Sequence, residues 1–216
     1  MRPDVTINGT SMKSLGWLRE SISFPVPQSQ TESTTVPGRN SPIRFSVVNN
    51  RISYKPRTFK IVLAVLAERK DFMTMVSKAA QLFAGVLSKV VLSERPDVYA
   101  YGTLQLENEY DTDTNKGTLT ISCEDGDSFL YHASKTTVKQ TGNGSVALPN
   151  DFMPAVPSIT VTADTTLSWQ VDSENMTKTL SSGTWIVPEL ELLAGDNSVT
   201  VTTTGDVTFE YQEGCL

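Results

Sequence analysis

The residue types on which most enzymes depend are scarce in this chain. Its 216 residues include one histidine, His132, and two cysteines, Cys123 and Cys215. No nucleophile elbow of the G-x-S-x-G kind accompanies the histidine, and there is no Walker-type loop or dinucleotide fingerprint. One histidine and two distant cysteines give little support for a zinc site. We therefore expect a protein that is not an enzyme and that carries no cofactor.

Long apolar runs are also missing. The longest run, "IVLAVLA" at Ile61 to Ala67, is too short to cross a bilayer, and "MRPDVTINGT" at the N-terminus has no apolar signal segment. We expect no membrane association, synthesis in the cytoplasm, and free thiols at Cys123 and Cys215 rather than a disulfide framework.

Basic clusters are the third absence. Residues 1–132 hold 15 Lys and Arg against 14 Asp and Glu, whereas residues 133–216 hold 3 against 10, a net charge of −7. An acidic second part repels phosphate backbones, and the first part has no basic stripe that would release many counterions. Sequence-specific nucleic-acid binding is therefore not expected.

The residues that are present indicate a folded protein with two domains. Hydrophobic residues make up 38% of the chain and charged residues 19%, which is ordinary for a globular protein, and 216 residues can bury two small cores. We expect an α+β, mainly β, chain with a first domain at 1–132 and a β-sandwich at 133–216.

The first domain is expected to be a mixed sheet with one helix. The segment "FKIVLAVL" is typical of a strand that is buried on both faces. Further on, "DVYAYGTLQLENEY" and "KGTLTISCED" alternate at period two around "DTDTN" and predict a hairpin. Spacings of three and four residues predict a helix over about 71–91, with an apolar stripe made of Phe72, Val76, Ala79, Phe83, Leu87 and Val90.

The second domain consists of short segments rich in Thr, Val and Ser. Turn signals such as "TGNG", "LPND", "AGDN" and "TTGD" recur every eight to twelve residues, and no helical period interrupts them. This pattern favours an antiparallel β-sandwich. The polar segment "HASKTT" is the expected linker.

One loop begins like a calcium-binding loop. Asp111, Asp113 and Asn115 stand at alternate positions, but an EF-hand needs glycine at the sixth position and glutamate at the twelfth. Lys116 and Ser122 occupy those positions here. A solvated hairpin loop is the favoured interpretation.

Two further pairs deserve a functional and a structural interpretation. Glu189 and Glu191 would share one face of a strand, as a glycosidase pair can, although surface carboxylates do the same without chemistry. Trp169 and Trp185 could stack on a sugar, or they could fill the sandwich core, which their strand-like surroundings favour.

The order of segments resembles a known family, the distal tail proteins of long-tailed, non-contractile bacteriophages and related prophages. The N-terminal resemblance lies in "TINGTSMKSLGW", in "TESTTVPGRNSPI", and in the strand, helix and hairpin that end in "GTLTISCEDGDSFLYH". Ser41 stands where the family usually has glycine. The residues that match the family's "VPGR" segment are Val36, Pro37, Gly38, Arg39 and Asn40.

The C-terminal resemblance lies in "WIVPELELLAGDNSVTVTTTGDVTFEYQEGCL". Family members often have a Pro-x-Leu step, a Gly-x-Asn turn and two closing strands in this region. The matching residues are Pro188, Leu190, Gly195 and Asn197. Together the matching segments cover nearly the whole chain.

The resemblance implies a structural virion protein at the tail tip. Distal tail proteins form a hexameric ring through the N-terminal domain, with a galectin-like sandwich outside it. The ring bridges the tail-tube protein and the tail-associated hub or fibre protein, in some members carries receptor-binding proteins, and lets DNA pass. The alternative is a carbohydrate-binding module that recognises host saccharide through the sandwich.

Within this resemblance the segment from Pro37 to Asn40 is a candidate assembly element. Pro37 fixes the backbone and Gly38 permits a reversal, in a polar stretch from Pro25 to Pro42 that could serve as an arm. Arg39 is then expected to anchor the segment through a carboxylate or carbonyl groups of its own or a neighbouring subunit.

Overall fold

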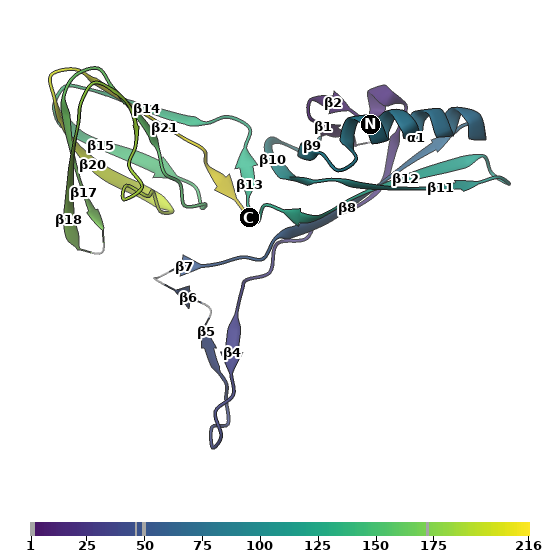
Figure 1. The fold of residues 1–216 in the computed structure, drawn as a ribbon, viewed down its shortest axis with the longest axis horizontal. Coiled ribbons are helices and arrows are strands. Elements are labelled where there is room, and N and C mark those ends of the chain that lie inside the picture. The colour runs from purple at the N-terminus through teal and green to yellow at the C-terminus, as the bar shows by residue number, and fades with distance from the viewer. Residues whose placement is uncertain (1–2, 46, 49–50, 172) are drawn as a thin grey trace. The chain divides into compact units, whose positions relative to one another are not determined.

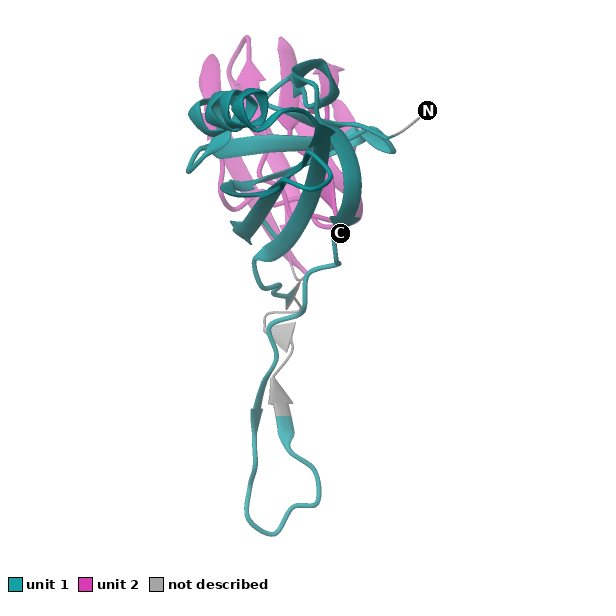
Figure 2. Cartoon of the chain, turned by 90° about the vertical axis from the view of Figure 1, so that its right-hand side faces the viewer, with its two compact units in different colours: residues 1–130, 216 teal, residues 131–215 magenta. Residues whose placement is uncertain are grey.

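The computed structural model describes residues 3–45, 47–48, 51–171 and 173–216, and for residues 44–51 it describes no side chains. The chain forms two compact units, 1–130 with Leu216 and 131–215 (Figure 2). The sequence placed the boundary after residue 132, whereas the chain divides after Leu130.

Apart from the short strands within residues 32–52, the strands from residue 5 to residue 132 form two sheets, one of which also includes the C-terminal strand β22 (Figure 1). One sheet has the order β2-β1-β9-β10-β13-β22 and the other has the order β11-β12-β8-β3. The strands of the first sheet are β1 (Val5–Ile7), β2 (Thr10–Ser11), β9 (Leu87–Leu92), β10 (Arg95–Thr103), β13 (Leu130–His132) and β22 (Gly214–Cys215). Those of the second are β3 (Leu18–Ser23), β8 (Arg57–Leu66), β11 (Gln105–Asp111) and β12 (Lys116–Gly126). A 3₁₀-helix, Lys13–Leu15, joins β2 to β3.

Strand β8 is the segment that was expected to be buried on both faces, and that expectation is wrong. Phe59, Ile61 and Leu63 are buried, whereas Lys60 between them is exposed. The strand therefore alternates with period two, as a sheet with one face on the core requires. Its aliphatic outward residues, such as Val62, are only partly covered.

The helix is shorter than the apolar spacing predicted. Helix α1 spans Arg69–Phe83, and Gly85 follows it with a φ of 69° that ends the helical path. Leu87 and Val90 belong to β9 instead, where period two replaces the helical period. The stripe continued past the helix because residues at spacings of three and four can also fall on a following strand by coincidence.

The predicted hairpin is present as β11 and β12, which pair from Gln105 opposite Ser122 to Asp111 opposite Lys116. The "DVYAYGT" part of the segment is a separate strand, β10, paired with β9. Helix α1 contacts both hairpin strands (Figure 1). Phe72 of α1 is fully buried over Gly117 of β12 and packs edge-on against Trp17 at 6.1 Å between ring centroids.

A two-stranded arm connects β3 to β8 (Figure 1). Its short strands pair antiparallel, β4 with β5 and β6 with β7. Their bounds are β4 (Glu32–Thr34), β5 (Ile43–Phe45), β6 (Val47–Val48) and β7 (Arg51–Ile52). Residues 28–41 are all exposed, so the arm contributes no core to the described part of the unit.

The second unit is a β-sandwich of two four-stranded sheets, as the sequence predicted. The sheet orders are β14-β21-β16-β19 and β15-β20-β17-β18, and the printed strand pairs are antiparallel. Val, Leu, Ile and aromatic residues from both sheets form one buried cluster between them. The strands are β14 (Thr136–Thr141), β15 (Gly144–Asn150), β16 (Ser158–Val161), β17 (Thr165–Val171), β18 (Glu174–Leu180), β19 (Gly183–Ile186), β20 (Gly195–Thr203) and β21 (Asp206–Tyr211).

Among the residues that the structure describes, none of the helical segments combines the length and the apolar character that crossing a membrane would take.

Candidate functional site

The tip of the arm contains the segment that the resemblance singled out. The Arg39 amide donates to the Val36 carbonyl at 3.1 Å, and Gly38 has a φ of 86°. This is a reverse turn with Pro37 at the second position and glycine at the third, where a positive φ excludes most side chains. The turn is exposed throughout, so the structure places Arg39 and Asn40 at a solvent-facing reversal.

The base of the arm is held by Arg57, which the sequence analysis missed. Its side chain is 2% exposed and donates to the carbonyls of Pro25 at 2.9 Å and Ser128 at 3.0 Å. The guanidinium also lies 5.6 Å from the centre of the Phe24 ring. The sequence shows only a positive charge two residues before Phe59. The alternation of β8 places both side chains on the buried face of the strand.

Strand β3 lies at the end of its sheet, and a hollow opens beside it. In the described part of the chain β3 pairs on one side only, with β8. The hollow measures about 580 Å³ and is lined by apolar side chains, including Leu66, which is 77% exposed, and by the ion pair of Lys116 with Glu20 at 2.6 Å. An open edge with exposed apolar neighbours is a surface on which another chain can add.

The two tryptophans of the sandwich are not brought together. Trp169 lies on β17, is 7% exposed, and donates its indole N–H to the Glu189 carbonyl at 3.2 Å. Trp185 lies on β19 of the other sheet, is 41% exposed, and donates to the Ser181 carbonyl at 2.8 Å. Trp169 thus joins the core, and only Trp185 offers a ring face to solvent.

A polar hollow of about 440 Å³ lies on the sheet that contains Trp169. Its walls include Gln170, whose amide donates to Asn175 at 3.1 Å, together with Glu191 and Asp196. Amide and carboxylate side chains around the edge of an indole are the groups that hydrogen-bond sugar hydroxyls.

Two candidates from the sequence are explained by local structure. In the calcium-like loop, Asp111 accepts from the Asp113 amide at 2.9 Å and from the Thr114 hydroxyl at 2.7 Å, and these bonds lower the pKa of Asp111, the hydroxyl contributing most. Glu189 and Glu191 do not share a strand face, because the chain turns there, with the Leu190 amide donating to the Val187 carbonyl at 3.0 Å.

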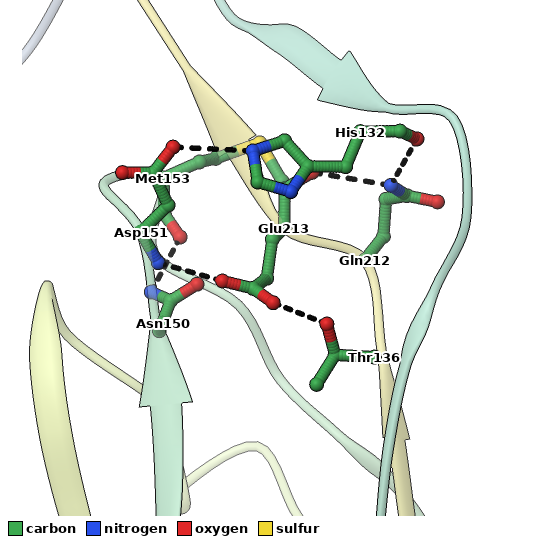
Figure 3. A network of polar contacts seen from close by, with 7 residues as sticks. All are labelled: His132, Thr136, Asn150, Asp151, Met153, Gln212 and Glu213. Atoms are coloured by element: carbon green, nitrogen blue, oxygen red, sulfur yellow. Dashed lines mark hydrogen bonds and ion pairs between the residues drawn. The ribbon is translucent and has the colours of Figure 1, made fainter. Parts of the chain in front are cut away.

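His132 takes part in a polar network at one end of the sandwich (Figure 3). Its Nε2 lies 3.1 Å from Oδ2 of Asp151. Glu213 accepts from the Asp151 amide at 2.8 Å and from the Thr136 hydroxyl, so one carboxylate ties β14 to the residue after β15. The network thus joins the imidazole to a carboxylate that is itself fixed through its backbone amide.

The cysteines have different surroundings. Cys123 is 1% exposed, and burial raises its pKa to about 11. Cys215 is partly exposed, and its sulfur, the His132 ring and the Asp151 carboxylate place one ligand atom each within 4.8 Å of one another. Within the described residues, neither Cys123 nor Cys215 forms a disulfide. The sequence offers little support for a zinc site made of the histidine and both cysteines, and in the structure Asp151, not Cys123, lies beside His132 and Cys215.

The sequence matches no model of a known protein family, and a search of curated proteins finds no match. The structure is similar to the crystal structure of SPP1 Dit (gp 19.1), described as a paradigm of the hub adsorption apparatus in phages that infect Gram-positive hosts. The TM-score is 0.71, with 13% identity over 99% of each chain. The chain has the Dit fold. The resemblance to phage distal tail proteins is thus confirmed for the fold over both units.

Proposed function

We propose that this chain is a structural protein of the phage tail tip that forms a ring, most simply of six subunits, through residues 1–130. The observation that carries the proposal is the similarity to SPP1 Dit over 99% of both chains, which includes both units and not a sandwich alone. A sandwich by itself would support many functions, because one fold hosts many.

The surfaces of unit 1 support ring formation. A ring closes through heterologous contacts, so each subunit needs two different, complementary surfaces, one for each of its neighbours. The arm, exposed from residue 28 to residue 41, is suited to reach a neighbour, and the open edge of β3 with its apolar hollow is suited to receive one.

In this proposal the ring links the tail-tube protein on one side to the tail-associated hub or fibre protein on the other, and DNA passes through its channel. Unit 2 faces outward and is available to a receptor-binding protein. Its net charge of −7 keeps it from trapping DNA, because like charges repel the phosphate backbone.

Arg39 is proposed to hold the arm tip on the neighbouring subunit. The guanidinium presents five donors from a solvent-facing turn, in a geometry that matches a carboxylate or a pair of carbonyls. Asn40 and the fixed backbone of Pro37 and Gly38 orient it.

The test is negative-stain electron microscopy with light scattering on the purified chain, which we expect to show rings. Arg39→Ala should weaken assembly by about tenfold, since an anchoring arginine contributes at least about 1.4 kcal/mol. Arg69→Ala, an exposed arginine in the first turn of α1, is the matched control and should leave rings intact. A chain that stays monomeric at high concentration overturns the proposal.

The sandwich hollow favours a second candidate, saccharide binding by unit 2. Glycan-array screening of the full chain tests it, with Gln170→Ala and Asn175→Ala as variants at the hollow and Trp185→Ala as the variant at the exposed ring. Trp169→Ala is a poor probe, because it would remove a core side chain. Absence of any glycan signal leaves the ring proposal untouched.

A further inference from the structure

We propose that His132, Asp151 and Cys215 form a binding site for a divalent transition-metal cation, with zinc as the best fit. The three potential ligand atoms lie within 4.8 Å of one another, and the imidazole Nε2 is 3.1 Å from the carboxylate. The proposal is independent of the ring function, since it concerns the sandwich unit alone.

The ligand chemistry selects the metal. Thiolate, imidazole and carboxylate are the ligands that zinc takes in proteins, whereas calcium and magnesium prefer oxygen alone. Tetrahedral bonds of about 2.0–2.3 Å would place the ligand atoms about 3.3–3.7 Å apart. The His132–Asp151 pair is already at about this separation, so a side-chain rotation that brings the Cys215 sulfur from within 4.8 Å to the same separation completes the set. Three protein ligands leave the fourth position to water.

The backbone around the three residues is fixed by its own hydrogen bonds. The His132 amide donates to the Glu213 carbonyl at 2.9 Å, and its carbonyl accepts from the Gln212 side chain at 2.8 Å. The Asp151 amide is held by the Glu213 carboxylate at 2.8 Å (Figure 3). The Met153 amide donates to the Gly214 carbonyl at 2.9 Å, which ties the Asp151 loop to the strand of Cys215. Such outer bonds orient ligands and raise metal affinity.

The competing explanation is a surface ion pair beside an unrelated thiol. The His132 and Asp151 side chains are 33% and 47% exposed, and pairs of this exposure contribute little to stability. An ion pair would not require a thiol, so the role of Cys215 separates the two explanations.

A metal at this position would join both ends of the sandwich unit. His132 lies at its beginning and Cys215 at its end, and Asp151 follows β15. Binding to the folded state alone raises the thermal midpoint of the unit, by about 10–20 °C at a hundredfold excess over Kd.

The experiment uses the full chain, stripped of metal with a chelator, reduced with a phosphine and titrated with cobalt(II). We expect the near-ultraviolet absorption of a thiolate-to-cobalt bond, saturating at one cobalt per chain and lost when zinc is added. Cys215→Ser should abolish the absorption, and His132→Gln and Asp151→Asn should weaken affinity at least about tenfold. Cys123→Ser, which removes the other thiol, should leave the band unchanged.

Several results would overturn the proposal. These are the absence of the band in the parent chain at one equivalent of cobalt, and a band that disappears in Cys123→Ser but survives in Cys215→Ser. Circular dichroism without metal checks that each variant is folded. Should Cys215→Ser fail to fold, unchanged cobalt affinity in both His132→Gln and Asp151→Asn is equally decisive against the site.

Discussion

Replacing Gly117 by alanine tests how α1 packs on the second sheet. A Cβ built at Gly117 would lie 2.1 Å from Cδ2 and 2.3 Å from Cε2 of Phe72, far inside ordinary contact distance. Phe72 is fully buried between Trp17 and Tyr110, whose ring centroid is 5.2 Å away, so its ring has no open space to enter. Overpacking of this kind costs typically 1–3 kcal/mol, and we expect about 2 kcal/mol from Gly117→Ala.

Urea unfolding measures this cost. Trp17 is 1% exposed and contacts Phe72, so its fluorine signal in fluorotryptophan-labelled protein reports on unit 1. With a denaturant slope near 2 kcal/mol/M, the unfolding midpoint should fall by about 1 M. Gly144→Ala in unit 2 is the control, followed through the fluorine signal of the buried Trp169, because the nearest atoms to its Cβ belong to the end of the flexible Gln140 side chain.

A double-mutant cycle with Phe72→Leu identifies the cause. The smaller side chain leaves room for the new methyl group, so the two changes together should cost at least about 1 kcal/mol less than the sum of the single changes. If Gly117→Ala has the same urea midpoint as the parent, or if the free-energy costs of the two single changes simply add, then the Phe72 ring does not obstruct a methyl group at position 117.

Three other predictions follow from the titratable groups. The hydrogen bond from the Arg19 side chain lowers the pKa of Glu94 to about 2. The stabilisation of the folded state by the Glu94 carboxylate is therefore fully present above its pKa of about 4.5 in the unfolded chain, and it is lost as the pH falls from about 4.5 to 2. Glu94→Gln should remove this pH dependence from the free energy of unfolding. Burial raises the pKa of Tyr211 to about 12, so stability should be lost as pH rises from about 10 to 12, and Tyr211→Phe should remove this loss in unfolding measured against pH. In native protein at pH 8 a thiol reagent should label Cys215 and spare Cys123, as mass spectrometry of the labelled peptides would show; rapid labelling of Cys123 would contradict its burial.

The fold was predictable wherever the pattern is local. The sandwich followed from turn spacing, and the β11–β12 hairpin followed from alternation around a polar loop, because period and turn chemistry act over a few residues. The end of α1 was not predictable in the same way. Leu87 and Val90 continue a helical spacing, and only Gly85 marks the change to β9.

The candidate sites depended on contacts between distant residues, which explains what the sequence missed. Asp151 lies 19 residues after His132, and Cys215 lies still further along, so no spacing motif links the three. Arg57 could be placed inside only once β8 was known to alternate, since a strand buried on both faces would have excluded a charged side chain.

The sheet order has a consequence for how the molecule can be altered. Strands β13 and β22, through which the chain leaves unit 1 and comes back to it, are hydrogen-bonded neighbours. Neighbouring strands lie about 5 Å apart, so the segment that connects β13 to β22 is an insertion whose two ends are close together. A foreign domain whose termini are close together could be spliced between His132 and Gly214 without lengthening either connection. The sandwich could in this way be exchanged in a single genetic step while β13 and β22 stay paired in their sheet.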